Sequence, residues 1–528
     1  MPAAMLPSPP HAVGHGLPWH VAVQDAVADI AAARARYGDT FTIEHGRERY
    51  VFTFSPTGVE SFYGLKEDVA SKGVADYLML RRKLPDVLFE GRRTLPGTLF
   101  GREDVAGYLS HLDHALDDAL AELGSAGTAD VFDLTRRLGH RLGLASWIGP
   151  AAASGAAFDR LVVAFDTLDG SDAFVHPDAM AAVAATGKRA ELAAMEEVVE
   201  IVGALVDARG SDAGTELFER IVASWAGEDD AVRRRGVALD VVLIHVASMS
   251  NLHAALGWAL VDLLEHPDAL ARVRAGDSDH TQRCALESTR LAQRSIMARS
   301  VLSPVRLDVG DAVYDVPAGW TIATLLPLLN TSAAPGLDAW RPWRWDRHRL
   351  RDTGELTSPQ LVTAFGHGRH TCPAQPFSLA AMTTALHRLV EALDLTPAWD
   401  THPAPVAAQI GGIARASGPV RLTYPVHRGF PTFSGRATPE NVRNSLRRSA
   451  RVGWPGARRA RGTAARAAGR RSPARSTTRR CGRGTARCRD RTRRPRPARR
   501  PARRRTPPPP RARHADRRSA GTWWRRGR

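Results

Sequence analysis

The decisive stretch of sequence is Phe365-Gly366-His367-Gly368-Arg369-His370-Thr371-Cys372-Pro373. Its two glycines allow the backbone to turn tightly, so that amide groups can face the cysteine sulfur. Pro373 suits the first position of a helix, which places Cys372 at a helix N-terminus. The free amides and the positive end of the helix dipole there favour a thiolate, the form that binds metals. The alternative is a glycine-rich turn beside an inert buried cysteine.

The pattern F-x-x-G-x-x-x-C resembles the haem-binding loop of the cytochrome P450 superfamily. The resemblance implies that Cys372 is the axial ligand to the iron of haem b and that His370 contacts a haem propionate. Phe365, which can shield the sulfur from water, and Gly368 would complete the loop's cofactor-binding residues. The loop is also similar to that of the sterol demethylase branch. Ala374 departs from the family, which usually has glycine there.

A second pattern is Glu287-Ser288-Thr289-Arg290, in which Glu287 and Arg290 share one face of a helix and can pair. Its place ahead of Cys372 resembles that of the family's Glu-x-x-Arg pair. The segment Trp340-Arg341-Pro342-Trp343-Arg344-Trp345 resembles the family's aromatic-x-Pro-x-Arg-aromatic segment, with Trp replacing Phe at both ends. Arg344 would then complete a structural network that holds the haem loop. A surface ion pair is the alternative.

Arg299 follows Arg290 at the distance where family members place an arginine that binds a haem propionate. The resemblance therefore adds Arg299 to the cofactor-binding residues. A solvated arginine at the end of a strand is an equally good interpretation of the sequence.

A third pattern is Ala247-Ser248-Met249-Ser250-Asn251, which the resemblance places against the oxygen-binding face of the haem. Most family members have an acid and a threonine there that relay protons, whereas this chain has Ser250 and Asn251, the two candidate catalytic residues. An asparagine amide does not titrate and relays protons poorly. The segment from Ala247 to Arg274 is similar to the prostacyclin synthase and bile-acid hydroxylase group, and asparagine also occurs here in members that rearrange peroxides. Alternatively, these side chains only bind local backbone carbonyls.

The net charge of +18 belongs to one end of the chain. Residues 441–528 hold 32 Arg, no Lys and two Asp, which leaves 41 basic against 53 acidic residues, a net charge of −12, in residues 1–440. Residues 433–528 cannot bury enough apolar surface to fold and are predicted to be disordered. The absence of Lys favours a frame-shifted translation of GC-rich DNA over a biological basic arm.

The rest of the chain predicts a mainly α fold with a small β-rich lobe, and the resemblance implies the cytochrome P450 fold. Residues 1–15 are expected to be a loose lead-in, and residues 16–432 the catalytic domain. Strands are expected in a hairpin around His45-Gly46-Arg47, between Val305 and Ile322, and at Val420–Tyr424. Helices are expected at Asp104–Leu123, Phe132–Trp147, Phe158–Leu168, Pro177–Val206, Arg233–Leu264, from Pro267 onward, from Gln282 to Arg290, and at Pro373–Leu393.

The resemblance implies a monooxygenase that inserts one oxygen atom from dioxygen into a small hydrophobic substrate. The sequence shows no dinucleotide-binding fingerprint and no iron–sulfur cysteine run, so electrons are expected from a separate ferredoxin or flavodoxin-type protein. The alternatives are a haem-thiolate peroxide isomerase, dehydratase or peroxygenase, and, from another class, nucleic-acid binding through the Arg-rich tail, which is less favoured. Four cysteines without a disulfide framework, no membrane span and no signal peptide lead us to expect a cytoplasmic protein.

Overall fold

The computed structural model describes residues 7–93, 105, 107–169, 176–209, 217–346, 349–350 and 354–427. The predicted disordered tail, residues 433–528, lies outside the described residues, as does the start of the helix predicted at Asp104–Leu123. Within the predicted loose lead-in, the backbone amide of Ala12 donates to Thr42 and Ala12 is buried. That part of the lead-in is therefore packed rather than loose.

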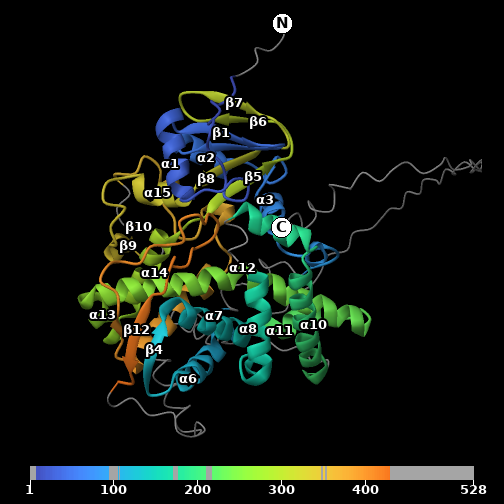
Figure 1. The fold of residues 1–528 in the computed structure, drawn as a ribbon, viewed down its shortest axis with the longest axis vertical. Helices are drawn as coiled ribbons and strands as arrows, with labels where there is room; N and C mark the ends of the chain where they lie inside the picture. Colours follow the sequence, from blue (N-terminus) through green and yellow to red (C-terminus); the bar gives the residue numbers. More distant parts are fainter. Residues whose placement is uncertain are drawn as a thin grey trace, which may run out of the picture. The chain divides into compact units, whose positions relative to one another are not determined.

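Helices dominate the described residues (Figure 1). The longest is α12, of 36 residues, and it is the yellow-green helix that runs across the middle of Figure 1. It packs against α7, α10 and α14, and most of its central residues are buried. The α-helices of the described residues are α1 (Ala26–Tyr37), α2 (Pro56–Gly64), α3 (Lys72–Leu80), α6 (Leu112–Leu123), α7 (Val131–Trp147), α8 (Gly155–Asp169), α9 (Pro177–Ala185), α10 (Arg189–Arg209), α11 (Leu217–Ser224), α12 (Asp230–Glu265), α13 (Pro267–Arg274), α14 (Ser278–Ala292), α15 (Leu326–Ser332) and α16 (Gln375–Ala392).

The strands form a small β-rich lobe whose main sheet has the order β1-β2-β8-β5-β3. Strands β2 and β8 are parallel and the other neighbours antiparallel, so the first hairpin lies beside strands from the middle of the chain (Figure 1). Smaller sheets pair β6 with β7, β9 with β10, and β12 with β11 and β4. The strands are β1 (Thr40–His45), β2 (Glu48–Thr53), β3 (Ala70–Ser71), β4 (Ala126–Asp130), β5 (Ile296–Val301), β6 (Val305–Asp308), β7 (Val313–Val316), β8 (Thr321–Leu325), β9 (Trp345–Asp346), β10 (Arg349–Leu350), β11 (Thr396–Pro397) and β12 (Arg421–Pro425).

The mainly α fold with a small β-rich lobe is confirmed, and two predicted helices differ in detail. The helix predicted over Pro177–Val206 is two helices, because Gly187 and Lys188 adopt left-handed φ angles of 61° and 57° between α9 and α10. The helix predicted from Pro373 begins instead at Gln375, with Pro376 in its first turn. Pro373 thus lies in the turn that leads into α16.

Helix α12 is also long and apolar enough to cross a membrane, the one such helix among the residues that the structure describes. Most of its apolar stretch is buried inside the protein against other helices. Its composition is accounted for by this packing, since a helix that crosses a protein core is hydrophobic on every side.

A buried histidine cluster lies where α7 meets α12. A Cβ atom at Gly139 would stand 2.7 Å from the Cβ of His253, and one at Gly143 would meet Met249, so glycine permits this close approach. His140 Nδ1 lies 2.8 Å from His245 Nε2, and His140 Nε2 lies 3.1 Å from a carboxylate oxygen of Asp166. Sequence periodicity marked these helices as core and missed the cluster.

Burial, with further contributions from the neighbouring charges, holds the pKa of His245 and His253 well below the ordinary value of about 6.5. The groups that face them include His140, Arg136 and Arg415, which also lower the pKa of one or both, and the carboxylate of Asp169, which lies 3.8 Å from His253 Nε2. Both histidines are therefore neutral in the folded protein at pH 7.

We predict that the free energy of unfolding falls as the pH drops below about 6.5. At such pH the two histidines are protonated in the unfolded chain but stay neutral in the folded protein. Each therefore lowers the free energy of unfolding by up to roughly 1.4 kcal/mol per pH unit. His253→Leu should lessen this acid dependence, as measured by urea unfolding at pH 7.5 and 5.5. His114→Leu, at an exposed position on α6, is the control. Equal acid dependence in wild type and His253→Leu would contradict the assignment.

Candidate functional site

The loop that ends in Cys372 is shaped by two features of its backbone. The amide of Cys372 donates to the carbonyl of Phe365 at 2.8 Å, which closes the turn. Gly366 has a φ of 81°, and a Cβ atom there would lie 2.5 Å from the carbonyl oxygen of His370. Glycine is therefore required at 366 by both conformation and space. Ala374 has a φ of −85°, so its methyl group, unusual for the family it resembles, causes no backbone strain.

The Cys372 sulfur faces the amides of Ala374 and Gln375 at the start of α16. Burial raises the pKa of the Cys372 thiol above its ordinary value, and these amides oppose that shift only in part. The site thus favours a thiolate only when a cation lies next to the sulfur. A cysteine that is partly accessible, held against two amides and desolvated is suited to bind a metal ion supplied by a cofactor.

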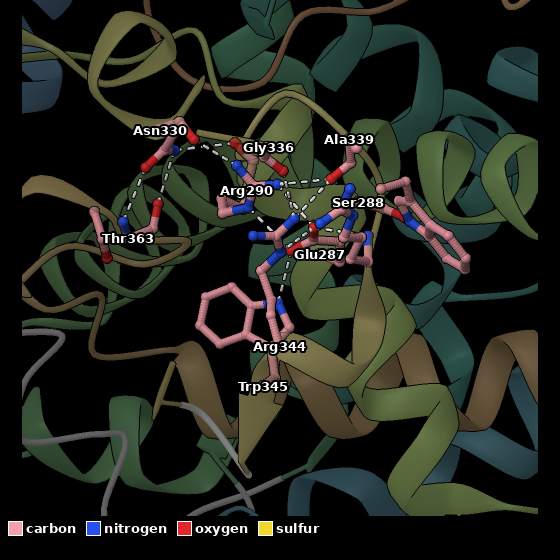
Figure 2. A network of polar contacts seen from close by, with 11 residues as sticks. Glu287, Ser288, Arg290, Asn330, Gly336, Ala339, Arg344, Trp345 and Thr363 are labelled. Atoms are coloured by element: carbon pink, nitrogen blue, oxygen red, sulfur yellow. Dashed lines mark hydrogen bonds and ion pairs between the residues drawn. The ribbon is translucent and has the colours of Figure 1, made fainter. Parts of the chain in front are cut away.

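The Glu287 carboxylate is the centre of a buried polar network that stabilises this part of the protein (Figure 2). One oxygen accepts from Arg290 Nη2 at 2.8 Å, from Arg344 Nε at 2.7 Å and from the amide of Arg341 at 2.9 Å. The other accepts from Arg290 Nε at 3.0 Å and from Trp345 Nε1 at 2.8 Å. The structure therefore brings Glu287, Arg290 and Arg344 together, and Glu287 and Arg290 are fully buried rather than a surface pair.

Asn330, which sequence reasoning missed, connects this network to the cysteine loop (Figure 2). Its Nδ2 donates to the carbonyls of Arg290 at 3.0 Å and Thr363 at 2.9 Å, and its Oδ1 accepts from the Thr363 amide at 2.9 Å. The Thr363 hydroxyl in turn accepts from the amide of Phe365 at 3.2 Å and donates to the carbonyl of Gly366 at 3.1 Å. An unbroken path of hydrogen bonds thus runs from α14 to the turn before Cys372.

Arg299 and His370, both predicted to bind haem propionates, lie side by side. Arg299 Nη1 is 2.6 Å from His370 Nε2, and its guanidinium is fully buried and donates to backbone carbonyls, including that of Ala70 at 2.8 Å. Burial, and then the charge of Arg299, lower the pKa of His370 to about 4. The interpretation of Arg299 as a solvated strand-end residue is wrong, because it lies inside the protein.

Two further polar groups adjoin this pair. The hydroxyl of Tyr63 and Nε2 of His367 are buried and have no hydrogen-bond partner among the described residues. Their rings meet edge to face at 5.3 Å, and the ring of Tyr63 lies 6.4 Å from that of His370. Unpaired buried polar groups are costly, so a cluster of them beside a buried arginine indicates a place for an anionic partner.

The polar segment of α12 combines two kinds of contact. The Ser248 hydroxyl donates to a carbonyl one turn earlier on the same helix, as the simpler interpretation of this segment expected, whereas Ser250 lies near such a carbonyl and also hydrogen-bonds the largely buried carboxylate of Asp169. Asn251 bonds to another segment: its Oδ1 accepts from the amide of Ile413, far away in the sequence, at 2.9 Å. Ala247 is exposed although it stands in the middle of a long, largely buried helix, so α12 presents an accessible face there.

These residues fit a haem. Cys372 supplies a desolvated sulfur that needs a cation, the cluster of Arg299, His367, His370 and Tyr63 supplies buried donors for acidic groups, and α12 has an accessible turn of small residues. Among the described residues, no cluster of three or more His, Cys, Asp or Glu side chains forms a separate metal site.

Comparison with known proteins finds similarity to cytochrome P450s. Abscisic acid 8'-hydroxylase 1 of Arabidopsis thaliana is 23% identical over 215 residues, which cover 37% of this chain and 44% of that protein. A putative cytochrome P450 of Mycobacterium tuberculosis, numbered 137, is 29% identical over 214 residues, 38% of this chain and 42% of that protein. The chain therefore aligns with less than half the length of these curated relatives. No family model matches the chain.

Among solved structures, the retinoic acid-bound cyanobacterial CYP120A1 superposes with a TM-score of 0.61 at 16% sequence identity, covering 80% of this chain and all of that one. The cytochrome P450 fold that the sequence predicted is therefore confirmed. So is the resemblance to the cytochrome P450 superfamily.

We predict that Glu287→Gln lowers the free energy of unfolding by about 3–5 kcal/mol, because it leaves the buried Arg290 without its counter-charge. A matched control is Glu196→Gln on α10, whose exposed carboxylate also meets an arginine, Arg235, at 2.8 Å. That change should cost less than about 1 kcal/mol, since solvent screens the pair. Chemical unfolding curves measure both. Similar losses in the two variants would show that burial of the network is not what stabilises it.

Proposed function

We propose that this chain is a haem-thiolate monooxygenase that inserts one oxygen atom from dioxygen into a small hydrophobic substrate. The observation that carries the proposal is the position of Cys372. Its sulfur faces two amides at the N-terminus of α16, and its loop is joined to the Glu287–Arg290 pair by continuous hydrogen bonds. An inert cysteine would need neither the two amides at its sulfur nor a loop held in place by hydrogen bonds.

Haem b would be held by Cys372 as the metal ligand and by Arg299 and His370 at its acidic groups. When bound, haem with a thiolate ligand supplies the activation of dioxygen. Phe365 follows directly after buried Ala364 and lies within the hydrogen-bonded turn, where it limits access of water to the sulfur. Gly368 has a φ of 57° and allows the turn that carries His370.

The substrate class is inferred from size and polarity alone. The names of several relatives refer to small, largely apolar molecules: abscisic acid for one, a dihydroxysteroid for another, and bound retinoic acid for the structural neighbour. The accessible turn of α12 offers Ala247 and uncharged polar groups, which suits a neutral or weakly polar skeleton. Electrons would come from a separate ferredoxin or flavodoxin-type protein, and we propose a cytoplasmic location.

The second candidate is a peroxide isomerase, dehydratase or peroxygenase. It is favoured by the residues at the accessible turn of α12, where Ser250 and Asn251 replace the usual acid and threonine. The Oδ1 of Asn251 is already bonded to Ile413 and its amide does not titrate, so it is poorly placed to pass protons. Nucleic-acid binding remains the less favoured third candidate, because only the Arg-rich tail supports it and, from residue 441 on, its sequence has a single aromatic residue, Trp454, before Trp523-Trp524.

We predict that the reduced, carbon monoxide-bound protein shows the strongly red-shifted absorption band of thiolate ligation. Cys372→His should abolish the shift. Cys284→Ser should retain it, because burial raises the pKa of the Cys284 thiol to about 12 and makes it inert. Loss of the shift in the Cys284 variant with retention in the Cys372 variant would refute the ligand assignment.

We also predict how the oxidant divides the two enzymatic candidates. With a surrogate electron donor, the wild type should turn over generic hydrophobic substrates with poor coupling and release hydrogen peroxide, since the proton relay is weak. Oxygen uptake, peroxide and product measured together give the coupling. Rapid turnover of a lipid hydroperoxide without any donor would replace the monooxygenase with the isomerase, and tight coupling on unrelated substrates would refute the weak relay.

A further inference from the structure

A short segment near the end of the described residues, Gly411–Ala414, runs along α12 and is fastened to it at two points. Asn251 Oδ1 accepts from the amide of Ile413 at 2.9 Å, and Trp258 Nε1 donates to the carbonyl of Ala414 at 2.7 Å. Asn251 and Trp258 are seven residues apart, which places them two turns apart on the same face of the helix. The segment therefore lies against the same side of α12 as the polar turn described above.

The same segment is held on its other side by the residues that join α14 to β5. The amide of Arg294 donates to the carbonyl of Gly412 at 2.9 Å, and the amide of Gly411 donates to the carbonyl of Arg294 at 2.8 Å. The Arg294 guanidinium donates to the carbonyls of Gln409 at 2.7 Å and of Ala407 at 2.6 Å. Gln293 extends this side toward the cysteine loop, since its Nε2 donates to the carbonyl of Ala364 at 2.8 Å.

Of the two glycines at the start of the segment, Gly412 is the one that packs against Asn251. Gly411 and Gly412 have φ angles of 125° and 66°, which disfavour other residues. A Cβ atom at Gly412 would stand 2.4 Å from Asn251 Oδ1, whereas one at Gly411 would meet nothing within 4 Å. The close approach of the segment to α12 therefore depends on glycine at position 412 and on the asparagine side chain at 251.

We propose that Asn251 is a positioning residue whose side chain latches segment Gly411–Ala414 to α12 and so limits the size of the molecule that fits beside the accessible turn at Ala247. The proposal rests on the proposed function, because it takes that turn to face the reacting molecule. On the α12 side, Gly412 and Ile413 are held by one neutral hydrogen bond from Asn251, with Trp258 fastening Ala414 one step further on. On the Arg294 side, two backbone bonds to Gly411 and Gly412 are backed by charge-assisted bonds to Gln409 and Ala407 just before the segment, so this side acts as the fixed edge.

This assignment gives the asparagine a role that a threonine could not fill. The Asn251 oxygen reaches a backbone amide of another segment, and a threonine hydroxyl, one bond shorter, would bond to its own helix as the Ser248 hydroxyl does. Asn251, in place of the family's threonine, would thus limit the size of the bound molecule and would not transfer protons.

The experiment compares Asn251→Leu, which keeps the size of the side chain but removes the acceptor, with Asn251→Asp, which keeps the acceptor. Hydrogen exchange of peptides that contain Ile413 reports the latch directly and needs no haem. Binding of imidazole and of bulky phenyl-substituted imidazoles to the haem protein, followed by difference spectra, reports the size limit. Asn251→Leu should speed exchange and raise the affinity ratio of the bulky over the small ligand, each by about fivefold, roughly the factor for one neutral hydrogen bond. Asn251→Asp should restore both readings to the wild-type values.

A second pair of variants tests the latch from the opposite side, and would do so even if Asn251→Leu failed to fold. Gly412→Ala should push the segment away from Asn251 and reproduce both changes. Gly411→Ala is the matched control, because it introduces the same methyl group at a left-handed residue without touching Asn251. Unchanged exchange and unchanged size ratio in Asn251→Leu or Gly412→Ala would overturn the proposal, as would equal effects of the two glycine variants. Loss of the thiolate spectrum in the wild type would instead refute the proposed function, while the exchange reading still decides the latch.

Discussion

The rest of the site depends on one buried carboxylate. Glu287 is fully buried and accepts from five donors, two of them on Arg290 and one each on Arg341, Arg344 and Trp345. Removing such a charge from water is expensive, and the cost is recovered only when every lone pair finds a donor in the right place. The carboxylate therefore fixes where α14, the segment around Arg344 and the start of β9 can lie relative to one another. Asn330 hydrogen-bonds both Arg290 and Thr363, so the position of the turn before Cys372 depends on Glu287, which lies 85 residues earlier in the sequence.

The surroundings of Cys372 do not stabilise its thiolate by themselves. Burial raises the pKa of its thiol, and the two amides at the start of α16 are too weak to reverse that shift. A neighbouring cation changes the balance, since it stabilises the thiolate while the amides already point at the sulfur. The same reasoning applies to Arg299, whose buried charge is met by a neutral His370 and by backbone carbonyls, with Glu67 at 3.4 Å its nearest acid. Both ends of the site thus gain from a group that brings a metal ion and acidic side arms together.

The sequence predicted the parts of this site that are carried by spacing along one segment. The F-x-x-G-x-x-x-C loop, the Glu287–Arg290 pair on one helix face and Arg344 after its tryptophans could all be identified in that way, and the long apolar helix marked α12. Asn330 could not be identified, because a lone asparagine between apolar residues gives no indication that it bridges two distant backbones. The place of strand β5, which carries Arg299, could not be predicted for a similar reason: its position between β8 and β3 is set by pairing with segments far away in the sequence. The break between α9 and α10 was not predicted, because a lysine rarely adopts a positive φ and Lys188 does so here.

Helix α12 shows how one element can meet two incompatible demands. Its face toward α7 must be desolvated and close-packed, and Gly139 and Gly143 on the partner helix give His253 and Met249 the space to achieve this. Its face at Ala247 is accessible, and small, uncharged residues occur there, with the Ser248 hydroxyl bonded within the helix and Ser250 also bonded to the carboxylate of Asp169. Asn251 lies between these two faces. Its side-chain oxygen accepts a hydrogen bond from the amide of Ile413 and is therefore not available to a molecule at the open face. Under the proposed function, a residue committed to a structural contact at this point leaves the proton for the reaction to come from another group: bound water, the substrate, or the largely buried carboxyl of Asp169, which is hydrogen-bonded to Ser250. The choice of substrate would then depend on which molecules can complete that proton path, and not only on which ones fit.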